Sequence, residues 1–277
     1  MFIALIRFLW VPLALMALLA LMPRPAHAAF DAQHTAFNTL LGKHVLRVSG
    51  GNASQLRYQG MAQERAALKL YLDSVSAVPR AEFNGWSKPQ RMAFLINAYN
   101  AFTIELVLTK YPALQSIKDL GSLLQSPWKK KFFTLFGEPT SLDDIEQAML
   151  RQRGAYDDPR IHFALNCASI GCPMLREEAY VAGRLDAQLD AQAERFMSDR
   201  SRNRYNGATG ELEVSKVFDW YGADFQLGHH GIASVAAFMA RYASRLTDVP
   251  AEQDKVRTQA ARITFLDYDW RLNDARP

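Results

Sequence analysis

The sequence predicts an α+β fold in which a mostly helical single domain packs on a small, mainly antiparallel sheet. Three observations lead to this prediction. Segments with helical spacing of apolar residues outnumber segments with strand-like alternation. The candidate strands are short and spread through the chain. No internal repeat or linker-like tract follows the first 28 residues, which favours one domain over residues 29–277.

A signal peptide is predicted for residues 1–28, ahead of the fold. Arg7 is followed by an apolar run over residues 8–22, which is short because a membrane-spanning helix needs about 20 apolar residues. An Ala-His-Ala cleavage pattern ends at Ala28. We therefore expect cleavage after Ala28, a periplasmic or secreted protein, and no membrane span in the mature chain.

The charge pattern argues against a nucleic-acid partner. The precursor carries a net charge of +4, and removal of Arg7 and Arg24 with the signal leaves +2. Basic clusters occur at residues 129–131 and 200–204, and neither is interleaved with aromatic residues as nucleic-acid-binding surfaces are. We expect no nucleic-acid partner and no cofactor. The expected partner is a small molecule, a peptide or a ligand of the cell envelope.

Helical spacing of apolar residues predicts most elements, and period-2 alternation predicts short strands between them. The expected helices cover residues 30–46, 61–78, 91–110, 141–151, 184–197 and 232–242, with another after Ser215, and residues 116–124 are expected to form a short helix or a turn. The expected strands cover residues 131–136, 161–165, 210–214 and 263–270. Helices that outnumber the strands to this degree are expected to cover the sheet.

The helix over residues 91–110 is apolar on nearly all sides, which indicates burial. Ser87 and Gln90 form a capping box at its start. Asn97 and Asn100 share one face of this helix, and a buried amide without hydrogen bonds costs about 1–3 kcal/mol. Two interpretations are open: the amides bind the backbone of a neighbouring loop, or they orient a catalytic group or hold a ligand.

Residues 156–173 are the stretch around which the candidate site is organised, because they hold both cysteines of the chain. Alternating apolar residues predict a strand over residues 161–165 with one buried face, ended by a Gly-Cys-Pro turn. The polar residues that we single out are His162, Asn166, Cys167, Ser169 and Cys172. This combination predicts either a reactive site or a local disulfide.

One hypothesis is thiol chemistry, in a hydrolase or acyl transferase that acts on amide or ester bonds. A cysteine nucleophile needs a thiolate, which a nearby histidine makes available. Cys167 would be the nucleophile and His162 the base. Asn97 or Asn100 would orient the histidine, as in papain-like or transglutaminase-like enzymes. The two reacting side chains meet only if the chain bends at residues 168–169 or if a bulge shifts the register. Backbone amides of residues 169–171 would then form an oxyanion hole.

A second hypothesis is an exported binding or scaffold protein of unknown biochemical function that catalyses no reaction. In an oxidising compartment, Cys167 and Cys172 are candidates for a disulfide that closes a small loop and constrains a local turn. The redox state of the cysteines separates this hypothesis from the first, because a bridged cysteine is not a nucleophile. Four tryptophans are candidates for lining an apolar groove: Trp86, Trp128, Trp220 and Trp270.

A third hypothesis is a zinc site built from His162, Cys167 and Cys172. These ligand types suit zinc, although their spacing is not that of a standard zinc ribbon or finger. A fourth ligand would have to come from elsewhere in the chain. Candidates for it are Glu146, His44, His229 and His230.

Several separated sequence blocks resemble one known family. The blocks are Phe94-Leu-Ile-Asn-Ala-Tyr-Asn-Ala101, Ser116-Ile-Lys-Asp119, Ser141-Leu-Asp-Asp-Ile-Glu146, Asp158-Pro-Arg-Ile-His-Phe-Ala-Leu165 continuing to Cys167-Ala-Ser and Cys172-Pro, Phe218-Asp-Trp-Tyr221, and Tyr268-Asp-Trp-Arg-Leu-Asn273. With these blocks in this order, over about residues 68–273, the chain resembles the domain of unknown function 547 family.

The resemblance implies a set of site residues but no activity and no roles. The set is Asn97, Tyr99, Asn100, Glu146, His162, Cys167 and Cys172. This chain has Gln147 where similar sequences often have histidine, so a scheme with a second histidine at that position does not apply to it. We expect binding contacts from Tyr99, Glu146, Asn166 and Ser169.

Overall fold

A computed structural model describes residues 29–122 and 125–275 of the chain. The signal peptide predicted for residues 1–28 lies outside the described residues. Asp31–Pro277 form one compact unit. No helix among the described residues is long and apolar enough to cross a membrane.

The helices confirm the predominance of helical structure. The α-helices are α2 (Thr35–His44), α3 (Tyr58–Gln63), α4 (Arg65–Ser76), α5 (Arg80–Gly85), α6 (Lys88–Leu108), α7 (Ile161–Ala164), α8 (Leu185–Ser198), α9 (Val217–Trp220), α10 (Val235–Ala240), α11 (Ala243–Leu246) and α12 (Pro250–Arg257). Short 3₁₀ turns are η1 (Ser49–Gly51), η2 (Ile117–Leu120), η3 (Pro127–Lys129), η5 (Ala182–Arg184), η6 (Gly222–Gln226) and η7 (His229–Gly231). One element, η4 (Asp144–Leu150), is a π-helix.

The strands form three small sheets in the described part of the chain. They are β1 (Val45–Val48) with β2 (Ala53–Leu56), β3 (Phe133–Leu135) with β4 (Glu138–Thr140), and β5 (Arg204–Asn206), β6 (Glu211–Val214) and β7 (Arg262–Phe265) in that order. Three of these four pairings are antiparallel, and the β6–β7 pairing is parallel. The α+β class is therefore confirmed, with the strands divided among separate short sheets. A parallel pair needs a long connection, and here α9 to α12 supply it.

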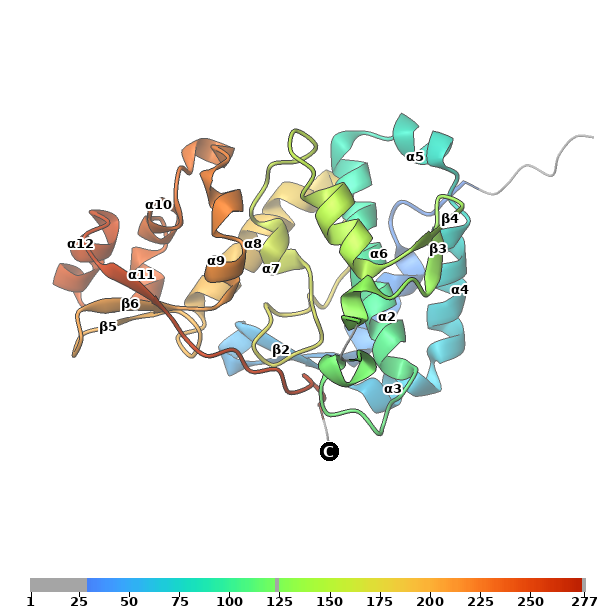
Figure 1. The fold of residues 1–277 in the computed structure, drawn as a ribbon, viewed down its shortest axis with the longest axis horizontal. Helices are drawn as coiled ribbons and strands as arrows, with labels where there is room; N and C mark the ends of the chain where they lie inside the picture. The colour runs from blue at the N-terminus through green and yellow to red at the C-terminus, as the bar shows by residue number, and fades with distance from the viewer. Residues whose placement is uncertain (1–28, 123–124, 276–277) are drawn as a thin grey trace, which may run out of the picture. The chain divides into compact units, whose positions relative to one another are not determined.

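Helix α6 is the centre of the N-terminal half. Its capping box is confirmed, because the Ser87 hydroxyl accepts from the Gln90 N–H at 3.4 Å and the Gln90 side chain accepts from the Ser87 N–H at 2.9 Å. Almost every residue from Met92 to Leu108 is buried. Helix α6 contacts α4, η4 and η5 (Figure 1). A helix buried on all sides presents residues both to the core and to the cleft described below.

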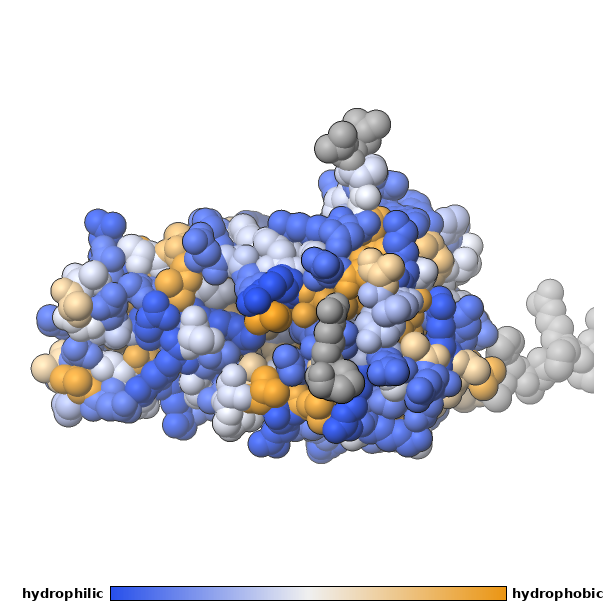
Figure 2. All heavy atoms as spheres, turned by 90° about the horizontal axis from the view of Figure 1, so that it is seen from below, coloured by the Kyte–Doolittle hydropathy of each residue, from blue (hydrophilic) through white to orange (hydrophobic). Residues whose placement is uncertain are grey.

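A second cluster of buried side chains fills the C-terminal half. It is built mainly from phenylalanines on different elements: Phe163, Phe196, Phe218, Phe225 and Phe238. In Figure 1, α7 and α8 lie between the helices α2 to α6 on one side and α10 to α12 on the other. The short helix α7 therefore stands between the two halves, and its residue Phe163 belongs to the second cluster. On the face drawn in Figure 2, hydrophobic residues lie in separate patches among hydrophilic ones.

The strand predicted over residues 161–165 is wrong, because the segment forms the helical turn α7. The Asp158 carboxylate accepts from the Arg160 N–H at 3.0 Å, and the Ile161 N–H bonds to the Asp158 carbonyl at 3.3 Å. All four residues of α7 are at most 4% exposed. The alternation of apolar residues marks a face only when the other face meets solvent, and here every side is buried.

The closing strand predicted over residues 263–270 is shorter than expected. After β7, the chain runs in extended form along the loop that holds the cysteines. The Ile170 N–H bonds to the Arg271 carbonyl and the Gly171 N–H to the Asp269 carbonyl, both at 2.8 Å. A Cβ atom on Gly171 would lie 2.9 Å from the Asp269 nitrogen, so this close approach requires glycine. We call residues 266–275 the C-terminal strap.

Candidate functional site

A cleft of about 440 Å³ lies where α6, η4, α7, α9 and the C-terminal strap converge. Its walls are largely aromatic, and its polar groups include two thiols, a histidine and two carboxylates. The residues that line it are Tyr99, Ser126, Trp128, Asp143, Glu146, Gln147, His162, Leu165, Cys167, Cys172, Pro173, Val217, Trp220, Tyr221, Tyr268 and Trp270. A concave, mostly apolar cavity with a few convergent polar groups is the usual form of a small-molecule site.

Asn97 and Asn100 hold backbone segments beside the cleft. The Asn100 amide donates to the Ala164 carbonyl at 2.9 Å and accepts from the Asn166 N–H at 2.8 Å. The Asn97 amide donates to the Tyr180 carbonyl at 2.8 Å and accepts from the Tyr180 N–H at 3.0 Å. Neither side chain bonds to His162. Of the two interpretations of these amides, the structure shows the contact with backbone.

The loop from Asn166 to Pro173 is braced from inside. The Asn166 side chain donates to the Pro173 carbonyl at 2.9 Å and accepts from the Ala168 N–H at 3.0 Å. Ala168 has a φ of 61°, so the predicted bend directly after Cys167 is present. These contacts fix the direction in which the Cys167 side chain leaves the backbone.

Two of the three backbone N–H groups predicted to form an oxyanion hole at residues 169–171 already have hydrogen-bond partners, so they do not form it. The N–H groups of Ile170 and Gly171 bond to the C-terminal strap, as described above. The Cys167 N–H bonds to the Cys172 sulfur at 2.9 Å. The sequence could not reveal the partners of Ile170 and Gly171, because the strap residues that accept these hydrogen bonds lie about a hundred residues further along the chain.

The Cys167 thiol lies in a compact set of hydrogen-bonding groups. Its sulfur is 3.2 Å from the Ser169 hydroxyl and 3.1 Å from the Tyr268 hydroxyl, and the Ser169 hydroxyl donates to the Tyr268 oxygen at 3.1 Å. Cys167 is half-buried and Cys172 is buried, and both are free thiols in the structure. The structure therefore contains no bond between the two predicted partners of a disulfide.

The two thiols have pKa values that move in opposite directions. Hydrogen bonding with the Cys172 thiol lowers the pKa of Cys167 to about 7, against the effect of burial, and the groups of Ser169 and Tyr268 add to the lowering. Burial raises the pKa of Cys172 well above its ordinary value, and Cys167 adds to this. Burial and the neighbouring thiols also raise the pKa of Tyr268. Cys167 is therefore the more acidic of the two thiols and the one that ionises first.

His162 is oriented by Asp224, a residue that the sequence did not indicate. Its Nε2 lies 2.7 Å from the Asp224 carboxylate. Arg151 holds that carboxylate with two hydrogen bonds, at 2.6 and 3.0 Å. Burial alone would raise the pKa of Asp224, but the bonds from His162 and Arg151 hold it well below its ordinary value. The Tyr221 ring stacks on the imidazole with ring centroids 3.9 Å apart.

His162 and Cys167 line the same cleft but do not bond to each other. Among the described residues, the hydrogen bonds of the Cys167 thiol run to its neighbours in the loop and to Tyr268, and that of the imidazole runs to Asp224. The sequence-based triad of Cys167, His162 and an asparagine is therefore not assembled in this structure. Asp224 lies 62 residues after His162, and no local pattern around it predicts the contact.

The π-helix η4 presents the Glu146 carboxylate to the cleft, and Asp143 lines the cleft directly before it. Ser141 and Asp144, spaced as in a capping box, bond at the start of this helical segment: the Asp144 carboxylate accepts from the Ser141 hydroxyl at 2.7 Å and the Ser141 hydroxyl accepts from the Asp144 N–H at 3.1 Å. Glu146 is 7% exposed and lines the cleft, and its carboxylate accepts from the Gln147 amide at 3.2 Å. A π-helix widens the turn and is frequent at functional sites. The sequence predicts the helix but not this wider turn.

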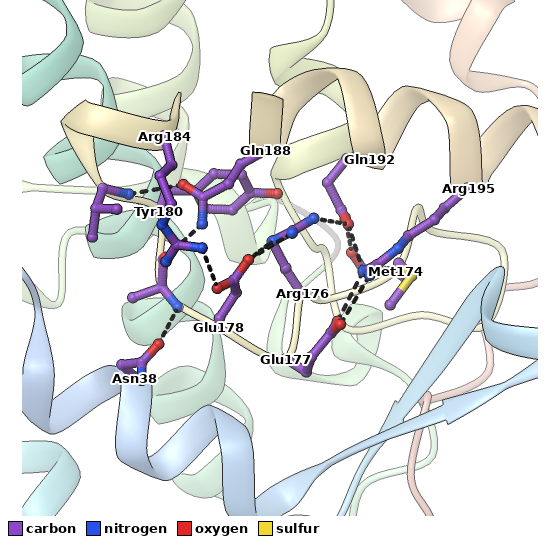
Figure 3. A network of polar contacts seen from close by, with 12 residues as sticks. Asn38, Met174, Arg176, Glu177, Glu178, Tyr180, Arg184, Gln188, Gln192 and Arg195 are labelled. Carbon is purple, nitrogen blue, oxygen red and sulfur yellow. Dashed lines mark hydrogen bonds and ion pairs between the residues drawn. The ribbon is translucent and has the colours of Figure 1, made fainter. Parts of the chain in front are cut away.

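A polar network fixes the segment that leaves the cleft after Pro173 (Figure 3). Gln192 on α8 donates to the Phe163 carbonyl at 3.2 Å and to the Met174 carbonyl at 3.0 Å. One amide therefore connects the segments before and after the loop that holds the cysteines. Arg195 holds Glu177 with two bonds of 2.9 Å. Helix α8 therefore supports the loop from the side opposite α6.

The remaining predicted residues divide between the cleft and the core. Tyr99 and three of the four tryptophans line the cleft, whereas Trp86 packs against Phe83 and Phe94. The Asn166 side chain braces the loop, and the Ser169 hydroxyl contacts Cys167. The described residues contain no group of three or more His, Cys, Asp or Glu that could hold a metal ion, so the zinc hypothesis finds no ligand set there.

Comparison with known proteins identifies one family. Residues 83–197 match the family described as protein of unknown function, DUF547, and the chain resembles that family, as its sequence blocks predict. The matched range contains His162, Glu146 and both cysteines, whereas Asp224 and the C-terminal strap lie outside it. No curated protein and no solved structure matches the chain.

Proposed function

We propose that this protein is a thiol-dependent hydrolase or acyl transferase that acts on amide or ester bonds, with Cys167 as the nucleophile. The observation that carries the proposal is the Cys167 thiol in the cleft, with a pKa lowered to about 7 and with Ser169 and Tyr268 at hydrogen-bond distance. A thiol of this kind is about half ionised at pH 7. It therefore needs no contact with a general base to become a nucleophile.

His162 is proposed as the group that moves protons in the cleft. Its Nε2 is bound to Asp224, so Nδ1 is the ring nitrogen that remains for exchange with a substrate. The Asp224 carboxylate fixes the orientation of the imidazole ring. Arg151 keeps the carboxylate in place from the other side. Asp224 and Arg151 are thus positioning residues, and His162 is the acid.

The proposed reaction has two steps. The Cys167 thiolate attacks the carbonyl carbon, the C=O electron pair moves to oxygen, and the tetrahedral intermediate expels the amine or alcohol, which takes a proton from His162. The acyl group is then bound to Cys167 as a thioester. Water or an acceptor amine attacks the thioester, loses its proton to His162, and releases the thiolate.

Export is part of the proposal. The short apolar run and the Ala-His-Ala pattern at residues 26–28 support a cleaved signal and a peptide or cell-envelope substrate. N-terminal sequencing of the protein recovered from the periplasm or the medium is expected to begin at Ala29. Recovery of the intact precursor from the cytoplasm would contradict this part.

Two linked measurements test the thiol chemistry. Alkylation of the mature protein by iodoacetamide is expected to modify one residue, Cys167, with a rate that reaches half its maximum near pH 7. Release of nitrophenol from nitrophenyl acetate is expected to show a burst that leaves an acetyl group on Cys167. Cys167→Ser should remove both signals, whereas Cys172→Ser should keep Cys167 as the alkylated residue. A protein two hydrogens lighter that resists alkylation has the disulfide, and the proposal then falls.

Non-catalytic binding is the second candidate function. The observation in its favour is the exposed indole of Trp220, 44% exposed at the cleft, beside Trp270 at 5.6 Å between ring centroids. Large exposed apolar groups of this kind mark binding sites. A protein that binds ligands in the cleft equally well with and without Cys167, and that shows no acyl intermediate, would establish this alternative.

A further inference from the structure

The cleft is acidic although the chain as a whole is basic. Asp143 and Glu146 line it, and none of the described residues that line it is lysine or arginine. The precursor carries a net charge of +4. The proposed Cys167 thiolate would add a further negative charge. Clefts lined by one sign of charge concentrate ligands of the opposite sign.

Neither carboxylate forms an ion pair with any described residue. Glu146 is 7% exposed and hydrogen-bonds only neutral groups, the Gln147 amide at 3.2 Å and the Tyr221 side chain. Asp143 makes no hydrogen bond or ion pair within the described chain. A buried carboxylate loses hydration, and hydrogen bonds from neutral groups compensate for this less than an ion pair does. A positively charged ligand would supply that compensation.

Two cationic side chains around the cleft have partners of their own. The Arg151 guanidinium is bound by the Asp224 carboxylate through two hydrogen bonds, and it does not line the cleft. The Lys118 ammonium lies 3.8 Å above the Trp270 ring and is also not among the lining groups. Arg151 also donates to the Gln147 side chain and attracts the Glu146 carboxylate electrostatically, but it forms no ion pair with Glu146 or Asp143 among the described residues.

The walls of the cleft suit a cation as well. Trp220 and Trp270 are inclined at 31° with ring centroids 5.6 Å apart, and Trp128 meets Trp270 at 68° and 5.9 Å. Aromatic faces attract ammonium groups through their quadrupole, and tryptophan does so most strongly. Aromatic rings together with carboxylates are the combination that recognises organic cations. An anionic ligand would meet repulsion from both carboxylates.

We infer that the cleft recognises an organic ammonium group of the substrate, held by Glu146 and Asp143 against the tryptophan faces. The inference deepens the proposed function and rests on it only for the reaction that follows binding. The substrate class is then an amide or ester that carries an amino group near the bond attacked by Cys167, such as a peptide with a free α-amino or lysine-type amino group.

Charged thiol reagents test the inference at the site itself. The Cys167 thiolate attacks the sulfenyl sulfur of a methanethiosulfonate, a mixed disulfide forms, and methanesulfinate leaves with the electron pair of the broken S–S bond. The rates for aminoethyl, sulfonatoethyl and methyl methanethiosulfonate are measured and divided by the rates for glutathione. We expect the cationic reagent to be favoured over the anionic one by about tenfold or more, and the preference to fall with added salt.

Matched variants connect the preference to the two carboxylates. Glu146→Gln and Asp143→Asn keep shape and remove charge, and each should lower the cation preference about threefold or more at low salt. The controls are Glu138→Gln and Asp73→Asn, which remove exposed carboxylates that do not line the cleft and should leave the preference unchanged. Equal rates for the two charged reagents in the unmodified protein would overturn the inference.

A second measurement separates this inference from the proposed function. Binding of hexylammonium and of hexanol to Cys167→Ser is followed by tryptophan fluorescence, which needs no reactive thiol. Hexylammonium should bind more tightly, and Glu146→Gln should remove the difference. Equal binding overturns the inference even if Cys167 is reactive. An unreactive Cys167 with selective ammonium binding removes the proposed chemistry and leaves the inference standing.

Discussion

Helix α6 and the cleft beside it both hold buried polar side chains, and the two regions use them differently. On α6, the Asn97 and Asn100 amides each donate to a carbonyl and accept from an N–H of the backbone. In the cleft, Glu146 and Asp143 have no ion-pair partner among the described residues, and the Cys167 thiol is held by hydroxyl groups. Polar groups whose bonds are all made within the chain hold the fold, whereas those left incomplete are available to a ligand.

The largest loss of stability is expected from a substitution of Phe218 on α9. Trp220, two positions further along the same helix, is the comparison. Phe218 is 1% exposed in the C-terminal core, and Trp220 is 44% exposed at the cleft. Phe218→Ala should lower the free energy of unfolding by about 3–5 kcal/mol, because it leaves a cavity. Trp220→Ala should lower it by less than about 1 kcal/mol. Urea unfolding followed by circular dichroism measures both, and equal losses would place Trp220 in the core rather than at the cleft.

The second largest loss of stability is expected when the buried amide of Asn100 is removed. Asn100→Ala leaves the Ala164 carbonyl and the Asn166 N–H without partners, and should cost about 2 kcal/mol of unfolding free energy. Asn84→Ala, at an exposed position of α5, is the control and should change stability by less than about 0.5 kcal/mol. Thermal unfolding of the two variants compares them. If Asn100→Ala were as stable as the control, the amide would not be the brace inferred here.

Asp224 should contribute a pH-dependent stability. Bonds from His162 and Arg151, acting against burial, lower its pKa in the folded protein. A group of this kind stabilises the fold above its unfolded pKa and loses that contribution as the pH falls through the folded pKa. Asp224→Asn should therefore cost about 1.5 kcal/mol at neutral pH, and the difference from the unmodified protein should shrink below the ordinary pKa of 3.8.

The control for Asp224 is Asp219→Asn, which removes a half-exposed ion pair with Lys216 and should have a small effect at every pH. Urea unfolding at a series of pH values measures both variants. A stability difference for Asp224→Asn that grows as the pH falls would contradict the assigned direction of the pKa shift.

The smallest expected change is in the pKa of Cys167 when the hydrogen-bonding groups around its sulfur are removed. Cys172→Ala removes the group that contributes most to the lowered pKa of Cys167, which is about 7, so that pKa should rise by about one unit. Tyr268→Phe should raise it less, and Cys172→Ser keeps a donor and should also raise it less. The pH dependence of iodoacetamide alkylation measures the three shifts. An unchanged pKa in Cys172→Ala would show that the neighbouring thiol does not stabilise the thiolate.

Sequence patterns predicted the regions whose contacts are local. The capping box of Ser87 and Gln90 and the cap of Ser141 and Asp144 follow from spacing alone, because the bonded groups lie three residues apart. The burial of α6 follows from its continuous apolar run. The strand over residues 161–165 failed because alternation does not distinguish a strand from a helical turn that is buried on every side.

The sequence by itself determined the fold class, the caps of the helices, and the residue types that make thiol chemistry conceivable, because these depend on neighbours along the chain. Only the tertiary structure decided which groups surround them. Asp224 meets His162, and Tyr268 meets Cys167, across separations of 62 and 101 residues. The charge of the cleft comes from carboxylates that packing brings together with the aromatic walls. The pKa of its thiol is lowered chiefly by Cys172, five residues along the chain, and the distant Tyr268 adds to that effect only because the fold brings it there.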